Sequence, residues 1–302
     1  NYNFYIFIFD NTLSFWKAYS PQIKQITIAT IHGMTMKNEY SMKINDFRYM
    51  RRGKHLSELQ SEEANLLAPV NQRGKGTERA LLVLHGFSSS PAVYRYLIPN
   101  LKNYDAILCP VLAGHAESIE AFSKSKAADW LQSAKNACEL LINQYQKVDV
   151  LGLSLGGLLA CQLSQSYAIN HLFLLAPALK LHMRINAMLK LAQILKCLGF
   201  RQLRNAAGNI ITDEHAEIAY RKLPISTIIE MLTLAQEYEW LPPTCPADLF
   251  LGIHDQVVAS QQVEQLFCNL PNVKIHWLKN SAHVLPLDND LNEIIDCINK
   301  SK

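Results

Sequence analysis

Short runs of β-branched and aliphatic residues alternate with longer segments of helical periodicity from residue 80 onward. Six runs predict strands: Ala80–Leu84, Ala106–Val111, Val148–Leu153, His171–Leu175, Asp248–Ile253 and Val273–Leu278. Each run is apolar almost throughout, which is typical of strands that helices cover on both faces. The alternation therefore predicts an α/β fold with a mostly parallel sheet and helices on both of its faces.

The segments between these runs place apolar residues three and four positions apart, as in a helix with one buried side. They predict helices at Pro91–Leu101, Lys126–Gln146, Leu155–Ser166, Ser260–Leu270 and Leu291–Ile298. About 70 residues separate Leu175 from Asp248, where a crossover needs a dozen or more. We therefore expect an inserted helical cap at about residues 180–245, with an amphipathic helix over residues 183–200.

The chain before residue 79 lacks this alternation and is interpreted as an N-terminal lead-in, so the predicted domain spans residues 79–302. Residues 1–40 are interpreted as a leader or an appended sequence, because the chain begins with Asn and has later methionines. A basic cluster in the lead-in is interpreted as a solvated face, because no aromatic residues are interleaved with it. It consists of Arg48, Arg51, Arg52 and Lys54.

Composition narrows the class of protein. The 302 residues are 49% hydrophobic and 18% charged, which allows a sizeable core and excludes disordered and fibrous classes. A net charge of +3 gives no field strong enough to imply nucleic acid as a partner. No apolar run approaches the roughly 18 residues of a membrane span, so a soluble protein is expected. The seven cysteines form no C-x-x-C pair and predict buried thiols in a reducing compartment, the cytoplasm.

The strongest local motif is the G-x-S-x-G pentapeptide in Val150-Leu-Gly-Leu-Ser-Leu-Gly-Gly157, between an apolar strand and an apolar helix. Such a turn holds its serine in a strained conformation with the hydroxyl projecting. Ser154 is therefore the candidate nucleophile, and the unpaired Leu155 amide at the helix start can face an oxyanion. Three fixed positions recur by chance in roughly one such chain in ten, so an ordinary glycine-rich turn is the competing interpretation.

A serine hydroxyl is a poor nucleophile until a base removes its proton, so a histidine and an orienting acid are required. His283 directly follows the last predicted strand and lies at the same carboxyl edge of the sheet as Ser154. Asp255 follows the preceding strand, 101 residues after Ser154 and 28 before His283. The competing side chains are interpreted as core, surface or helix-capping residues: His171, His182, His215, His276, Asp288 and Asp290.

An oxyanion needs a second amide, and the strand end Leu81-Leu-Val-Leu-His-Gly-Phe87 can supply it. Gly86 permits close approach of backbone, so the Phe87 amide can converge with that of Leu155 on one point. Each such donor contributes roughly 3 kcal/mol in oxyanion sites. Three independent strand ends therefore agree on one site.

These motifs resemble the α/β-hydrolase superfamily, and within it the bacterial carboxylesterase and monoacylglycerol lipase group. The resemblance follows the chain in order through His85-Gly86-Phe87, Pro110-Val-Leu-Ala-Gly-His-Ala116, Asp129-Trp130, Gly152–Gly157 and Ser281-Ala-His-Val-Leu-Pro-Leu-Asp288. It implies Ser154, Asp255 and His283 as the catalytic triad and the amides of Phe87 and Leu155 as the oxyanion hole. Two residues depart from the family pattern, Ala116 and Ala282, where glycines are usual.

The resemblance implies a serine carboxylic-ester hydrolase that forms an acyl-enzyme from apolar short- or medium-chain esters or monoacylglycerol. No cofactor or metal is expected in this reaction. Acyl transfer or peptidase activity with the same triad is an alternative, because the nucleophile does not specify the acceptor. A ligand-binding homologue without turnover is another, and the oligomeric state is left open.

The predicted cap is cationic. Residues 180–212 contain six basic residues and no acidic one. The hypothesis is that its apolar side lines an acyl pocket and its basic side contacts an anionic lipid surface or a carboxylate product. A packed lid helix with a solvated polar face is the simpler interpretation.

Overall fold

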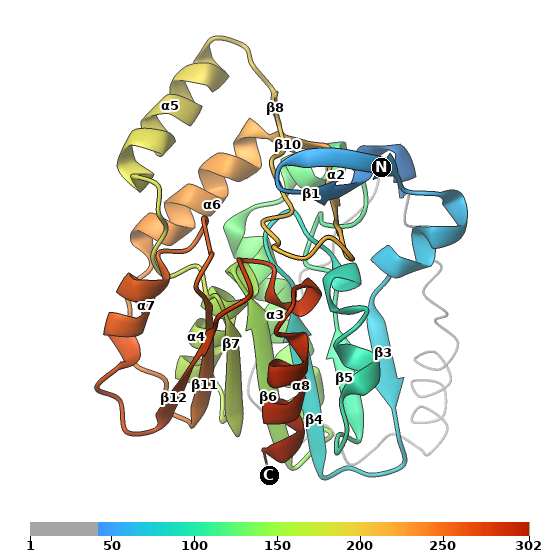
Figure 1. The fold of residues 1–302 in the computed structure, drawn as a ribbon, viewed down its shortest axis with the longest axis vertical. Coiled ribbons are helices and arrows are strands. Elements are labelled where there is room, and N and C mark those ends of the chain that lie inside the picture. Colours follow the sequence, from blue (N-terminus) through green and yellow to red (C-terminus); the bar gives the residue numbers. More distant parts are fainter. Residues whose placement is uncertain (1–41, 302) are drawn as a thin grey trace, which may run out of the picture. The chain divides into compact units, whose positions relative to one another are not determined.

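A seven-stranded sheet runs through the centre of the computed structural model, which describes residues 42–301 (Figure 1). Its spatial order is β12-β11-β7-β6-β4-β5-β3. The strands are β3 (Val70–Arg73), β4 (Arg79–Leu84), β5 (Ala106–Cys109), β6 (Lys147–Leu153), β7 (His171–Leu175), β11 (Ala247–Gly252) and β12 (Val273–Leu278). Six of them were predicted from apolar runs, and all six pair in parallel, which confirms the predicted sheet.

The seventh strand, β3, comes from the segment interpreted as a lead-in. It pairs antiparallel with β5 at the edge of the sheet. The expected boundary at residue 79 thus falls between two strands of one sheet. Because β3 is short and mostly exposed, its sequence lacks the apolar run that identifies the buried strands. The interpretation of residues 1–40 lies outside the described residues.

Helices cover both faces of this sheet. Residues on α3 (Ala127–Ile142), α4 (Leu155–Ser166) and α7 (Ser260–Phe267) share one apolar cluster with Leu82 and Leu84. The neighbouring residues Leu81 and Val83 point to the other face. There they pack with α8 (Leu291–Lys300) and two short 3-10 helices, η3 (Pro91–Tyr94) and η4 (Ile98–Asn100). Both faces of β4 are buried, as its continuous apolar run predicts.

Four of the five predicted helices between strands are confirmed as α3, α4, α7 and α8. The fifth, Pro91–Leu101, is wrong as a continuous helix, because that segment forms η3 and η4 instead. Pro99 lies in η4, within the predicted helix, and its missing N–H cannot donate to the preceding turn. The sequence interpretation also missed α2 (Ile119–Lys124) and the 3-10 helices η1 (Ile44–Asp46) and η5 (Leu285–Leu287), and a further 3-10 helix, η2 (Ser61–Leu67), lies in the lead-in.

Between β7 and β11 the chain leaves the sheet. This part, which we term the cap segment (residues 180–245), contains α5 (Ile185–Cys197), β8 (Gln202–Arg204), β9 (Glu217–Tyr220), β10 (Lys222–Pro224) and α6 (Ile225–Glu237). Helix α5 corresponds to the amphipathic helix expected over residues 183–200. Figure 1 shows α5 and α6 beyond one end of the central sheet.

The cap segment is joined to the first described residues by a small sheet. Strand β1 (Phe47–Arg51) pairs with β2 (Lys54–Glu58) on one side and with β9 on the other. Two residues of the basic cluster, Arg51 and Arg52, form ion pairs with Asp213 in the cap segment. These two arginines therefore bind the cap segment rather than only facing solvent. Within residues 42–301, no helix is both long enough and apolar enough to cross a bilayer.

Candidate active site

The candidate nucleophile lies at the sharp turn between β6 and α4. Ser154 has φ of 54° and ψ of −113°, outside the regions that suit most side chains, and its residue is 8% exposed. The turn is tight because a Cβ on Gly152 would come 2.3 Å from the oxygen of Gly156. A Cβ on Gly156 would come 2.1 Å from the oxygen of Leu84. The sequence folds this way because glycine at these two positions lets the strand and helix pass closely.

Backbone strain is concentrated at this edge of the sheet. Four of the six described non-glycine residues with positive φ follow the carboxyl ends of parallel strands. They are Ser88 after β4, Ala116 after β5, Ser154 after β6 and Ala176 after β7. Such conformations cost of order 1–3 kcal/mol each and persist where the surrounding structure holds them. The strained residues therefore indicate that a functional site lies at the carboxyl edge.

The candidate base and acid are in contact. His283 Nδ1 donates to Asp255 Oδ2 at 2.8 Å. The other oxygen of that carboxylate accepts the amides of Val257 at 2.7 Å and Val258 at 2.8 Å. These three bonds fix the carboxylate and leave Nε2 of the imidazole free to take a proton.

Charge stabilises the protonated form of this histidine. Burial lowers the pKa of His283, but the Asp255 carboxylate, through its charge and its hydrogen bond, more than compensates, and the pKa is raised above 6.5. Burial raises the pKa of Asp255, but His283 and the two backbone amides lower it by more, so this pKa lies below its usual value and the carboxyl remains ionised. The pair can therefore accept a proton and hold it beside a fixed negative charge.

Close backbone packing brings the Asp255 and His283 loops together. A Cβ on Gly252, at the end of β11, would come 2.1 Å from the oxygen of Ala282. Asn209 of the cap segment bridges the two loops: its backbone oxygen accepts the amide of His283 at 3.0 Å, and its side chain accepts the Gln256 amide at 3.0 Å. Sequence reasoning missed Asn209, because nothing in a lone asparagine indicates which distant loops it joins.

Asp288 and Asp290 do not act as the helix caps that their sequence position suggested, and that interpretation is wrong. Asp290 is the residue before α8 but makes no side-chain capping bond. It accepts instead from the amide of Asn280 at 2.7 Å and the hydroxyl of Ser281 at 2.9 Å. Asp288 accepts from the amide of Ala282 at 2.8 Å. Both carboxylates thus hold the loop that carries His283.

The two candidate oxyanion donors lie on either side of the serine turn. A Cβ on Gly86 would come 3.5 Å from Cβ of Ser154, so the end of β4 runs directly beside the serine. Leu155 begins α4, where the first amides lack helical partners. Neither its amide nor that of Phe87 has a hydrogen-bond acceptor within residues 42–301. Both donors are therefore available to an anionic oxygen.

Buried histidines and aromatic rings support the Phe87 strand end. His85 Nε2 accepts the amide of Leu112 at 3.1 Å, while its Nδ1–H donates to the oxygen of Gly86 at 2.9 Å. Burial lowers the pKa of His85 to about 4, so the ring stays neutral in this role. The ring of Phe87 packs edge-on against that of Trp130, with centroids 5.7 Å apart. The strand end that carries the Phe87 amide is thereby held rigidly.

The two departures from the family pattern differ in their effect. Ala116 has φ of 54°, a conformation that glycine adopts without cost. Ala282 is not among the described residues with positive φ, and it is fully buried. Alanine in place of glycine therefore strains the backbone at residue 116 but not at residue 282.

Glu217 is a further buried carboxylate near the base that sequence reasoning missed. It lies on β9 and accepts the amide of Gly208 at 2.8 Å. Burial raises the pKa of Glu217, and its negative charge raises that of His283. A glutamate in a short strand of the cap segment carries no motif, so only the fold brings it to the site.

The serine is placed at the same edge as the Asp255–His283 pair, but no hydrogen bond joins Ser154 to His283 in the described part of the chain. Of the other histidines, His182 lies near the site, with Nε2 3.2 Å from the backbone oxygen of Asp255. His171 and His276 both contact Asp248, at the opposite edge of the sheet. They are therefore polar partners of one carboxylate rather than simply packed side chains.

Comparison with known proteins assigns the chain to a family. Residues 81–296 match the alpha/beta hydrolase family. A thermostable monoacylglycerol lipase of Bacillus sp. (strain H-257) is 27% identical over 226 residues, which cover 72% of this chain and 87% of that protein. A carboxylesterase of Bacillus subtilis (strain 168) is 22% identical over 224 residues, covering 72% of this chain and 89% of that enzyme.

Solved structures agree on the fold. A solved structure reported for LipS and LipT, two metagenome-derived lipolytic enzymes, superposes on this chain with a TM-score of 0.67 and 26% sequence identity. The match covers 78% of this chain and 98% of that chain. The monoacylglycerol lipase of Paleococcus ferrophilus superposes with a TM-score of 0.59 and 18% identity, covering 77% of this chain and 98% of the other. At that identity the second likeness concerns the fold alone.

Proposed function

Because this chain belongs to the alpha/beta hydrolase family, we propose that it is a serine carboxylic-ester hydrolase for apolar short- or medium-chain acyl esters or monoacylglycerol. One observation carries the proposal. The His283–Asp255 hydrogen bond of 2.8 Å lies at the same edge of the sheet as the strained Ser154 turn. An oriented imidazole, a projecting hydroxyl and two unpaired amides are the parts that acyl transfer through a serine requires.

In the proposed mechanism, His283 Nε2 takes the proton of the Ser154 hydroxyl as the serine oxygen attacks the ester carbonyl. The carbonyl oxygen becomes an oxyanion and accepts from the amides of Phe87 and Leu155. As this tetrahedral intermediate collapses, His283 returns the proton to the departing alcohol. Water, deprotonated by the same imidazole, then attacks the acyl-enzyme, and collapse of the second intermediate releases the acid and restores the serine. Asp255 keeps the imidazole in the required tautomer throughout.

The substrate class rests on the relatives and on the surface of α5. The relatives are named for monoacylglycerol and carboxylic esters. Exposed apolar side chains on and beside α5 offer contact to an acyl chain or a lipid surface: Met183, Met188, Leu191, Ile194, Leu198 and Phe200. Basic residues from Lys180 to Arg204 can hold the same surface against anionic lipid. Neutralising Arg184, Lys190 and Lys196 should then weaken adsorption to anionic vesicles at low salt; unchanged adsorption would contradict this contact.

Replacement of the nucleophile tests the proposal. We expect Ser154→Ala to lower hydrolysis of p-nitrophenyl butyrate by about 10⁶-fold while the chain still folds, because no other hydroxyl occupies the turn. The matched control is Ser166→Ala, an exposed serine at the other end of α4, which should keep full activity. Retention of activity in Ser154→Ala would refute the proposal. Product analysis with competing alcohols measures any acyl transfer by the same site.

A further inference from the structure

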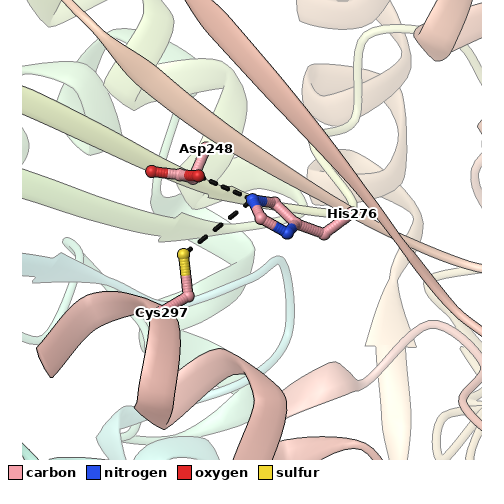
Figure 2. A group of neighbouring side chains, drawn as sticks. All are labelled: Asp248, His276 and Cys297. Carbon is pink, nitrogen blue, oxygen red and sulfur yellow. Dashed lines mark hydrogen bonds and ion pairs between the residues drawn. The ribbon is translucent and has the colours of Figure 1, made fainter. Parts of the chain in front are cut away.

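A second cluster of reactive side chains lies at the amino edge of the sheet, away from the candidate active site. It contains Asp248, His276 and Cys297, whose ligating atoms all lie within 4.8 Å of one another (Figure 2). His276 Nε2 is 2.6 Å from Asp248 Oδ1 and 3.8 Å from Cys297 Sγ. Figure 2 shows the imidazole nitrogen facing both the carboxylate and the sulfur.

Strand register brings these side chains together. Asp248 is the second residue of β11 and pairs with Lys274 of β12, so His276 lies two residues further along on the same face. Cys297 lies on α8, which packs against that face. The three groups therefore come from three rigid elements, and a well-placed site does not depend on a loop.

The cluster is open to solvent on one side. It borders a recess of about 750 Å³, which Asp248, His276 and Cys297 help to line. Asp248 is 4% exposed, whereas the side chain of His276 is 33% exposed. Two acidic side chains of α8, Glu293 and Asp296, and two lysines also line the recess. A small cation can therefore reach the cluster without opening the fold.

We propose that Asp248, His276 and Cys297 bind one zinc ion. Imidazole nitrogen, thiolate sulfur and carboxylate oxygen are the ligands that zinc prefers. Tetrahedral zinc, with bonds of about 2.0–2.3 Å, separates its nitrogen and sulfur ligands by roughly 3.6 Å, close to the 3.8 Å between His276 and Cys297. Its nitrogen and oxygen ligands lie roughly 3.3 Å apart, so the 2.6 Å hydrogen bond between His276 and Asp248 must open by less than about 1 Å.

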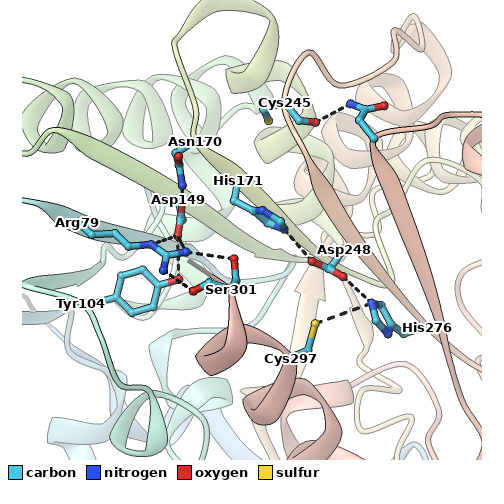
Figure 3. Close-up of polar contacts among 11 residues, drawn as sticks. Arg79, Tyr104, Asp149, Asn170, His171, Cys245, Asp248, His276, Cys297 and Ser301 are labelled. Carbon is cyan, nitrogen blue, oxygen red and sulfur yellow. Dashed lines mark hydrogen bonds and ion pairs between the residues drawn. The ribbon is translucent and has the colours of Figure 1, made fainter.

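His171 gives the carboxylate the outer support that metal ligands usually have. Its Nε2 lies 2.7 Å from Asp248 Oδ2, the oxygen that His276 does not use (Figure 3). The bond orients Asp248 and leaves Oδ1 for the ion. Water completes the coordination from the open side of the recess.

The proposed ion is structural, because it lies far from the candidate reacting groups. Strand β11 carries Asp248 near its start and leads to Asp255 beyond its end, and the four strand residues from Asp248 to Gly252 alone span roughly 13 Å. The ion would tie α8 to β11 and β12. Figure 3 shows a neighbouring anchor of α8's end, where Arg79 binds both Asp149 and Ser301. Zinc would add a second attachment for the same helix.

The test measures zinc binding by the tag-free full chain after chelator treatment. Competition with a chromogenic chelator should give one equivalent of tight zinc, and saturation should raise Tm by about 5 °C. Cobalt in place of zinc should show a thiolate-to-cobalt charge-transfer band. Cys297→Ser should weaken zinc binding by at least about 100-fold and abolish both the band and the Tm shift.

Matched variants separate this site from adventitious binding. Cys268→Ser removes an exposed thiol elsewhere and should leave all three readouts unchanged. His171→Gln removes only the outer support and should weaken binding by roughly 10- to 100-fold. Wild-type zinc affinity, or a persistent charge-transfer band, in folded Cys297→Ser would overturn the proposal. So would the absence of tight zinc binding by the unaltered chain.

Discussion

Two aspartate–histidine pairs lie at opposite edges of one sheet and come from the same two stretches of chain. Asp255 contacts His283 at the carboxyl edge, and Asp248 contacts His276 at the amino edge. Each histidine follows its aspartate by 28 residues, two more than the 26-residue offset between paired positions of the parallel strands β11 and β12. The pair by itself therefore does not identify a catalytic site.

The surroundings of the two carboxylates distinguish the edges. The free oxygen of Asp255 accepts two backbone amides, whereas that of Asp248 contacts a second histidine, His171. His283 shares its edge with a strained serine turn and two unpaired amides, while His276 faces a thiol on α8. The comparison teaches that backbone geometry, more than the Asp–His contact, distinguishes the carboxyl edge from the amino edge.

Matched substitutions of the two histidines give the largest expected contrast. His283→Gln should lower kcat/KM for p-nitrophenyl butyrate by about 10⁴-fold or more, because it removes the base that the proposed mechanism requires. His276→Gln should leave kcat/KM within about twofold, because its side chain binds Asp248, which lies four strand residues, roughly 13 Å, before the carboxyl end of β11. Steady-state kinetics on folded variants, verified by circular dichroism, measures both. Equal losses of kcat/KM in the two variants would contradict the proposed difference in function between the two edges.

The sequence was sufficient to predict the buried strands, and it placed Asp255 and His283 just after strand ends, where the structure brings them into contact. Apolar runs identify β4 to β7, β11 and β12 because both faces of these strands are covered. It was insufficient for β3 and for the cap strands β8 to β10, which are short and pair with distant segments. Asn209 and Glu217 lie in this cap segment and reach the site only through the fold, so no local sequence pattern predicts their position there.

A second prediction concerns the charge of Glu217 near the candidate base, His283. In the proposed mechanism a neutral His283 takes the serine proton, so kcat/KM should fall as pH drops through its raised pKa, above 6.5. Because the charge of Glu217 raises this pKa, Glu217→Gln should move the acidic limb of the pH profile to lower pH. The control Glu214→Gln replaces an exposed glutamate of the cap segment and should leave the limb in place. A shift to higher pH in Glu217→Gln would contradict the assigned charge effect.

The smallest expected effect concerns backbone strain at the carboxyl edge. Ala116→Gly should raise the free energy of unfolding by about 0.5–1 kcal/mol, because glycine adopts the positive φ of this position without steric cost. Ala282→Gly should lower it by a similar amount, because that backbone is unstrained and the unfolded chain gains freedom. Urea denaturation compares the two variants. Destabilisation by Ala116→Gly would show that strain at residue 116 is absent.

The central claim is that Ser154 is made reactive by its position beside the Asp255–His283 pair. A fluorophosphonate probe tests this directly, since it reacts only with an activated serine. Mass spectrometry after proteolysis should find the adduct on Ser154, and His283→Gln should prevent its formation. A folded, unaltered chain that stays unlabelled, or that carries the adduct on another residue, would contradict the account.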